Sequence, residues 1–217
     1  MIDLQLIANH IEDPELRTLT LRLLASAPTE FYTAPASSSG KYHPQFDLGT
    51  GGLARHTAVV AVLGVDALRR YYPRNAEPPR HLVDTMLAAG LLHDRCKNGY
   101  PRWGRHTQAE HPQIAAQYIA DEASGSVGKP SPLVSAVCHA VRWHYGTWTA
   151  GEGHSPLFFA NGESTTTVDD VDALCLAEAD YFGSRRCWAA LDEDILMQMI
   201  GAYARPVDAG PSDLDLP

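Results

Sequence analysis

Cysteine is scarce in this chain, and no two cysteines have the spacing of a redox or metal-binding pair. The 217 residues include four cysteines, at positions 96, 138, 175 and 187, without any C-x-x-C motif. Long apolar runs are also missing, since the longest ones break at Gly, Arg or Asp within about 18 residues. The first residues, Met-Ile-Asp-Leu-Gln-Leu-Ile-Ala, carry neither a basic region nor a small-residue cleavage site. The sequence therefore predicts a cytoplasmic protein with reduced thiols and no membrane contact.

Positive charge is in short supply. The chain has 17 Lys and Arg against 26 Asp and Glu, which gives a formal net charge of −9. An extended nucleic-acid surface needs clustered cations to neutralise phosphates, so this balance argues against one. A small anionic substrate needs only a metal and two or three cations, so the negative net charge does not exclude one. The length predicts a single domain over residues 1–204 with a sizeable core, followed by a disordered acidic tail at 205–217.

Helix signals occur along most of the chain, and no segment shows the alternation of a β-strand. Helices are expected from about Gly51 to Tyr72, from Pro78-Pro79 into residues 93 and 94, from about 168 to 182, and around 191–203. Asp13-Pro14 and Ser131-Pro132 have the pattern of an N-cap followed by proline in the first turn. These signals predict an all-α helical bundle.

The start of one helix has two alternatives. Thr107-x-x-Glu110 resembles a capping box, whereas His111-Pro112 has the pattern of a helix start in its own right. Both alternatives place His111 in or beside the first turn.

The most informative motif is the pair His93-Asp94, which closes the apolar helix that includes Leu91 and Leu92. Ionisable groups at the buried end of a helix are costly unless a partner compensates them. A divalent metal ion compensates both at once, since neutral imidazole and ionised carboxylate are ligands for Mn, Fe, Co, Ni and Zn. Gly90 precedes the pair by one turn, and we expect it to leave room for a ligand or an ion.

Two other helices carry a metal-ligand type on their apolar face. His56 shares a face with Leu53 and Val60, and Asp180 shares one with Leu176 and Ala177. A lone inward histidine is usually a core residue, but a buried carboxylate on an apolar face needs a partner. Three inward metal-type groups on three amphipathic helices therefore favour a metal site.

The order His, His-Asp, Asp resembles the signature of the HD-domain superfamily of metal-dependent phosphohydrolases. Residues 91–97 match a Leu-Leu-His-Asp-Ile-Gly-Lys consensus except at Arg95 and Cys96. The chain is most similar to the HD domains of bacterial 3′–5′ exoribonucleases, in which a Pro-Ala loop with His-His precedes Gly-Gly-Leu-x-x-His-Thr. Residues 34–37, His43 and residues 51–57 match that pattern, and His144-Tyr145-Gly146 is the counterpart of a later His-His-Gly. The resemblance covers about residues 31–183 and leaves residues 1–30 outside.

The resemblance implies two groups of metal ligands. The first metal would be held by His56, His93, Asp94 and Asp180. His111 and His144 would hold a second ion or, failing that, the substrate phosphate, and Tyr145 replaces the second His of the family motif. His139 lies five residues before His144, about 140° away around a helix, so both cannot easily face one metal. We favour His144 and leave His139 open.

The remaining site residues are assigned to catalysis and substrate binding. Asp94 would double as a bridge or a base, and Lys97 would neutralise charge on the phosphate oxygens. The substrate-binding candidates are Lys41, His43, Arg55, Arg142 and Tyr145. The His-rich set favours one or two ions of Mn, Fe, Co or Ni over Mg, which prefers oxygen ligands.

These features together predict an HD-family phosphohydrolase that cleaves a phosphoester or phosphoanhydride bond of a small nucleotide-type molecule. It would be a phosphomonoesterase, a phosphodiesterase or a nucleotidase. The first alternative is a 3′–5′ exonuclease acting on single-stranded nucleic acid. The second is a non-catalytic, nucleotide-sensing HD module. The sequence leaves open whether the chain forms a homo-oligomer.

Overall fold

The computed structural model describes residues 2–37, 39–41, 43–72, 76–125, 128–145, 171–185 and residue 198. Within these residues it contains helices and no strand, which confirms the all-α prediction. The predicted tail at 205–217 and nearly all of the helix expected over 191–203 lie outside the described residues.

The described residues form eight α-helices and one short 3₁₀ helix. In chain order they are α1 (Leu4–Ala8), α2 (Pro14–Ala25), α3 (Thr29–Thr33), η1 (Gln45–Asp47), α4 (Gly52–Tyr71), α5 (Arg80–Leu92), α6 (His111–Ser124), α7 (Pro132–Trp143) and α8 (Val171–Gly183).

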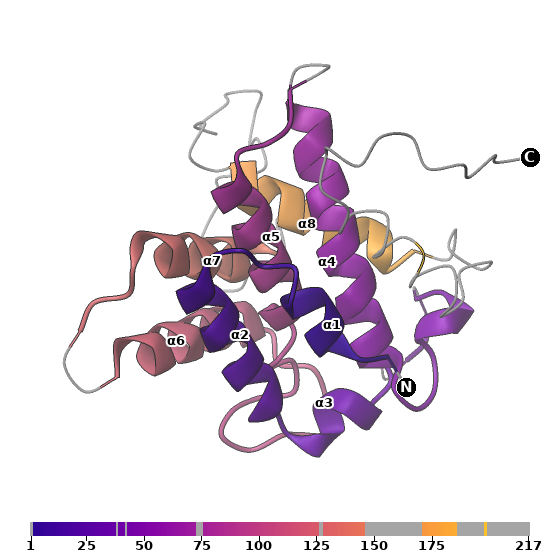
Figure 1. Cartoon of the computed structure of the whole chain (residues 1–217). Coiled ribbons are helices and arrows are strands. Elements are labelled where there is room, and N and C mark those ends of the chain that lie inside the picture. Colours follow the sequence, from indigo (N-terminus) through magenta and orange to yellow (C-terminus); the bar gives the residue numbers. More distant parts are fainter. Residues whose placement is uncertain are drawn as a thin grey trace, which may run out of the picture.

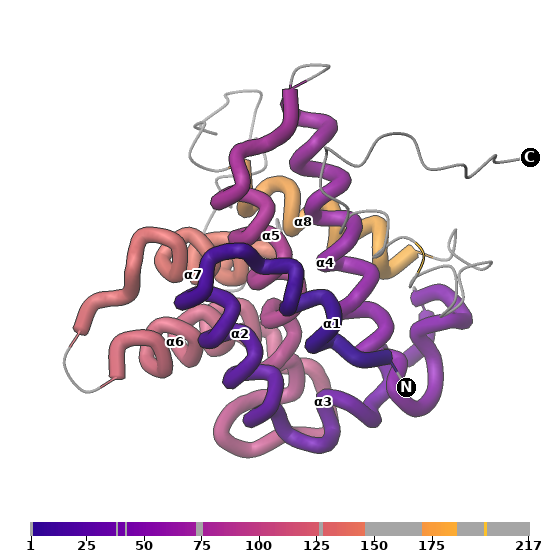
Figure 2. The backbone as a smooth tube through the Cα atoms, in the orientation of Figure 1, coloured from indigo at the N-terminus to yellow at the C-terminus, as the bar shows by residue number. Residues whose placement is uncertain are grey.

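The longest helix, α4, forms the spine of the bundle. It packs along α5 on one side and against α8 on another, and α5 in turn contacts α7 and α2. Figure 1 shows α4 and α5 as neighbouring upright helices, with α8 crossing behind them, α6 and α7 to one side, and α1 and α2 in front. Figure 2 shows the end of α4 and the start of α5 close together at the top of the view. Residues from α1 to α8 share one hydrophobic cluster, and α5 contacts α1, α2, α4, α7 and α8, so it lies at the centre of the described helices.

The expected helix starts are mostly confirmed. Asp13 caps α2 by accepting a hydrogen bond from the Leu16 N–H at 2.8 Å, and Ser131 accepts one from Val134 at the start of α7. Helix α6 begins at His111, with Glu110 as an N-cap that makes no side-chain capping bond. The capping-box alternative was therefore wrong, because Glu110 stands at the cap itself and Pro112 occupies the first turn.

Arg95 ties the N-terminal helices to the turn after α5. Its buried guanidinium donates to the carbonyls of Leu23 and Ser26, both at 3.0 Å, and to the Tyr118 hydroxyl at 3.0 Å. Because a buried charge is stable only when its donors are satisfied, this network fixes α2 against the residue that follows Asp94. Among the described residues, no helix is both long and apolar enough to cross a membrane.

Gly90 serves helix packing rather than ligand binding, so the expectation of space for an ion beside it was wrong. A Cβ at this position would lie 2.5 Å from Cα of Ala61 and 2.9 Å from its nitrogen. The glycine therefore lets the backbones of α5 and α4 touch directly above the His-Asp pair.

We expect Gly90→Ala to lower the free energy of unfolding by about 1–3 kcal/mol, the usual cost of overpacking a core. Gly64→Ala is the matched control at the same helix contact, because its Cβ would meet the flexible Met86 side chain at 2.7 Å instead of backbone. Urea unfolding of both variants measures the difference. Equal losses of stability would contradict this account of Gly90.

Candidate metal centre

Five elements bring the six predicted metal ligands together at the centre of the bundle. His56 comes from α4, Asp180 from α8, and His111 from the first turn of α6. His93 caps the end of α5 with Asp94 directly after it, and His144 caps the end of α7. The four histidines and Asp94 are at most 1% exposed, and the Asp180 side chain is 15% exposed.

The first group of ligand atoms surrounds one end of Asp94. His56 Nε2 lies 3.0 Å from Asp180 Oδ1 and 3.7 Å from Asp94 Oδ2. His93 Nε2 lies 3.4 Å from Asp94 Oδ2 and 3.8 Å from Asp180 Oδ1. Ligand atoms that each lie about 2.1 Å from one ion are separated by roughly 3–3.5 Å, so these four side chains have the spacing of a metal site.

The second group lies at the other end of the same carboxylate. Asp94 Oδ1 is 3.1 Å from His111 Nε2 and 3.8 Å from His144 Nε2. The two histidine nitrogens are themselves 3.1 Å apart. Asp94 therefore contributes one oxygen to each group, which is the arrangement of a bridging ligand.

Backbone carbonyls fix the tautomers of three of these histidines. Nδ1 of His93, His111 and His144 lies 2.6–2.8 Å from the carbonyl oxygen three residues earlier in the chain. A carbonyl can only accept, so each Nδ1 carries a proton, and Nε2 is the nitrogen that each ring turns toward the cluster.

Two observations show that this donor set fits a cation. His93 Nε2 is buried and has no hydrogen-bond partner among the described residues. The Nε2 atoms of His111 and His144 face each other with their lone pairs, a contact that requires a shared proton or a bound cation. One ion in each ligand group would satisfy these nitrogens.

The electrostatics keep the carboxylates ionised. Burial alone would raise the pKa of Asp94, but the positive charge of Lys97, and to a smaller extent His93, holds this pKa well below its usual range. Burial would also raise the pKa of Asp180, but the hydrogen bond with His56 lowers it. Burial, with the neighbouring His93 and His111, lowers the pKa of His144 to about 3, so its ring is neutral and able to bind a metal.

Lys97 reaches the site from a turn. The helix expected to run into residues 93 and 94 ends at Leu92, and residues 93–98 form turns. The Lys97 N–H bonds to the Asp94 carbonyl in this turn, and its ammonium lies 2.5 Å from Asp94 Oδ2. Cys96, which replaces a glycine of the family consensus, is a buried core residue.

The substrate-binding candidates are spread more widely. The Tyr145 ring packs against His111, with centroids 4.9 Å apart, and the His43 ring lies 5.0 Å from that of His56. Lys41 is exposed in the loop before η1, and Arg142 lies in the last turn of α7.

Arg55 has a different partner from the expected phosphate. Its guanidinium donates to the carbonyls of Phe46, Leu48 and Thr50 at 2.6–3.1 Å. These carbonyls turn toward α4 and need donors, so Arg55 holds the loop before the helix in place.

Two features of the site were not predicted from the sequence. Asp47 is fully buried beside His56, although it lies in a loop without any periodic signal. A pocket of about 250 Å³ borders Lys97, with Trp103, Arg105, Pro35, Leu53 and Glu30 among its lining residues. The segment Tyr-Pro-Arg-Trp-Gly-Arg directly after the His-Asp motif, rich in aromatic and basic residues, was the available signal for this pocket.

Comparison with known protein families matches residues 53–184 to the HD domain. This range is more than half of the chain and contains all six ligands. The match is to the HD domain in general and does not single out the exoribonuclease-type branch. No curated protein and no solved structure matches the chain significantly. Proteins of this family are typically metal-dependent phosphohydrolases. Because the match spans the helices that bury the His, His-Asp and Asp motif in one cluster, the chain belongs to the HD-domain family.

Proposed function

We propose that this protein is a metal-dependent phosphohydrolase that cleaves a phosphoester or phosphoanhydride bond in a small, nucleotide-type substrate. The observation that carries the proposal is the position of Asp94. One of its oxygens faces His111 and His144, and the other faces His56, His93 and the Lys97 ammonium. Ligands and a cation thus converge on one buried carboxylate.

The donor set suggests which ions bind. His56, His93, Asp94 and Asp180 would hold one ion, and His111 and His144, with Asp94, would hold a second. Four imidazoles favour Mn, Fe, Co or Ni over Mg. A bound ion of this kind supplies Lewis acidity toward a phosphoryl oxygen and lowers the pKa of water.

Lys97 and Asp94 would have different roles in the reaction. Burial alone would lower the pKa of Lys97, but Asp94, and to a smaller extent Asp180, raises it. The ammonium therefore stays charged and can neutralise a phosphate oxygen. The low pKa of Asp94 makes it a weak proton acceptor, and this favours its role as a bridge over its role as a base.

The pocket beside Lys97 supports a small substrate. Its volume of about 250 Å³ suits a group of nucleoside size rather than a strand. Trp103 offers an aromatic wall on which a base can stack, and Arg105 offers a guanidinium for an additional phosphate oxygen. Glu30 also lines the pocket, and its negative charge would repel a continuous phosphate backbone.

A substrate panel tests the proposal. Metal-loaded protein is assayed with nucleoside mono-, di- and triphosphates, cyclic nucleotides and short single strands at two salt concentrations. We expect the highest kcat/KM for a small nucleotide, because a net charge of −9 leaves little basic surface to hold a strand. Asp94→Asn protein, purified in parallel, controls for contaminating phosphatases.

Two results would contradict the proposal. Processive shortening of strands, at a higher kcat/KM than any nucleotide, would favour the exonuclease alternative. Nucleotide binding without turnover, in protein that holds its full metal content, would favour the sensing module.

A further inference from the structure

Asp47 is a buried carboxylate that belongs to neither ligand group. It lies at the end of η1 and is fully buried. Its backbone carbonyl accepts a hydrogen bond from the Ala36 N–H at 3.1 Å and passes so close to α4 that a Cβ on Gly52 would lie 1.8 Å from it. Gly51, at φ +77°, makes the turn into the helix. The Gly-Gly pair thus permits the approach that presses Asp47 against α4.

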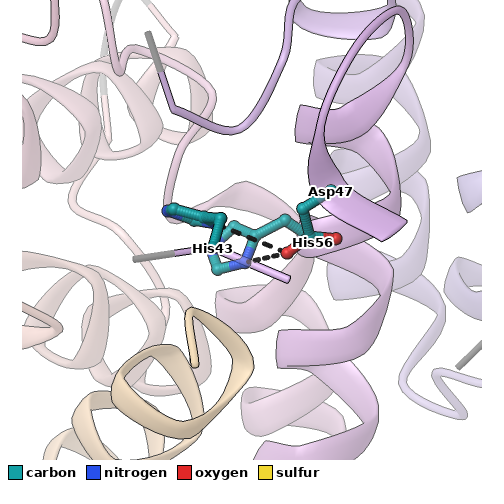
Figure 3. Close-up of side chains that lie close together, drawn as sticks. All are labelled: His43, Asp47 and His56. Atoms are coloured by element: carbon teal, nitrogen blue, oxygen red, sulfur yellow. Dashed lines mark hydrogen bonds and ion pairs between the residues drawn. The ribbon is translucent and has the colours of Figure 1, made fainter. Parts of the chain in front are cut away.

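The partners of the Asp47 carboxylate are two imidazoles. Its Oδ2 lies 3.5 Å from Nδ1 of His56 and 3.4 Å from Nδ1 of His43. Figure 3 draws both contacts as dashed lines. Its other oxygen, Oδ1, has no hydrogen-bond partner among the described residues. A buried carboxylate without a full set of partners costs free energy, so the negative charge of Asp47 needs a functional explanation.

His56 differs from the other three ligand histidines in what its Nδ1 faces. Theirs donate to uncharged carbonyls of the backbone, whereas Nδ1 of His56 makes no hydrogen bond within the described residues and faces the Asp47 carboxylate at 3.5 Å. Nε2 of His56 is hydrogen-bonded to Asp180 at 3.0 Å, so a metal bound there would take the place of the Nε2 proton and leave the other proton on Nδ1, beside Asp47.

We propose that Asp47 is a positioning residue for His56. It holds the Nδ1 proton, turns Nε2 toward Asp94 and Asp180, and would increase the electron density of the ring when a metal is bound, as carboxylate partners of metal-bound histidines do. His43 holds the carboxylate from its other side. The inference rests on the metal centre of the proposed function.

A further metal ion held by His43, Asp47 and His56 is the competing explanation, since their ligand atoms also lie within 4.8 Å of one another. Such an ion would take Nδ1 of His56 while Nε2 binds the first metal, and the ring would have to lose both protons. A neutral imidazole with one N–H donor satisfies Asp47 and the metal without that cost.

The experiment compares Asp47→Ala and Asp47→Asn in the full chain, with Asp84→Asn as the matched control. Asp84 is also a buried carboxylate, but it accepts hydrogen bonds from the Glu12 and Asp13 N–H groups away from the cluster. Titration calorimetry with Mn²⁺ gives affinity and stoichiometry. Proton NMR of the Zn²⁺-loaded protein reports the Nδ1–H of His56, which we expect to bond to Asp47 in that state.

For Asp47→Ala we expect metal affinity to fall by about 10–100-fold, with unchanged stoichiometry and loss of the His56 Nδ1–H resonance. Asp47→Asn should lose less, because its amide oxygen still accepts, and it keeps the test valid if the alanine variant does not fold. Asp84→Asn should keep wild-type affinity.

Two results would overturn the role of Asp47 while leaving the proposed function intact. One is wild-type affinity in both Asp47 variants. The other is the loss of one whole metal equivalent with unchanged affinity for the rest, which would assign Asp47 to a further metal site. Wild-type protein that binds no Mn²⁺ would instead remove the metal centre itself, and with it both proposals.

Discussion

Replacing Asp94 with Asn is expected to lower kcat/KM by about 10⁴-fold or more, the scale seen when a residue that works as a unit with its neighbours is removed. The carboxylate has one oxygen 3.1 Å from His111 and the other 3.4 Å from His93, so a single change reaches both ligand groups. An amide has no negative charge and only one oxygen. Metal content should fall together with activity, which elemental analysis of the purified variant measures.

Asp66→Asn is the control for Asp94→Asn. Asp66 is a carboxylate on the outer face of α4, where it pairs with Arg70 at 2.7 Å. Its loss should leave metal content and kcat/KM near wild type, because exposed ion pairs of this kind contribute little to stability. An Asp94→Asn protein with more than about a tenth of wild-type activity would rule out the central role of this carboxylate, since the expected loss is far larger.

Lys97→Met is expected to separate catalysis from metal binding. We expect kcat to fall by about 10²–10³-fold, the cost of removing one preorganised charge from a developing anion. Metal affinity should stay the same or rise, because the ammonium lies 2.5 Å from Asp94 Oδ2 and competes with a cation for that oxygen. Single-turnover rates and calorimetric metal affinities, measured on the same preparation, check the two halves of the prediction.

The assignment of Lys97 would be wrong if metal content fell in step with the rate. That outcome would make the lysine a structural partner of Asp94 instead of a group that meets the substrate. Lys97→Arg is the companion variant, since it keeps the positive charge and should recover part of the lost rate.

Most of the helices were predictable because their signals are local. The proline and N-cap at the start of α2, and the apolar spacing around His56 and Asp180, depend only on neighbours within a few turns. The same spacing pointed those two side chains inward. The clustering of His56 and Asp180 with the His-Asp pair followed from the family signature, and the structure brings these residues together.

The features that sequence could not provide all depend on contacts between distant segments. The partners of Arg55 are carbonyls whose direction is set by how the loop folds over α4. Gly90 could be assigned to packing only once α4 was placed beside α5. The burial of Asp47 likewise follows from the close approach at Gly52, which no periodicity in the loop records.

The anchoring of Arg95 bears on where this domain begins. The family match starts at residue 53, whereas two carbonyls that accept from Arg95 belong to Leu23 and Ser26. A fragment cut at the matched boundary would keep the guanidinium and lose those acceptors, next to the aspartate on which the whole site converges. We therefore expect a stable fragment to need the N-terminal helices as well as the matched segment, because they hold the residue that follows Asp94.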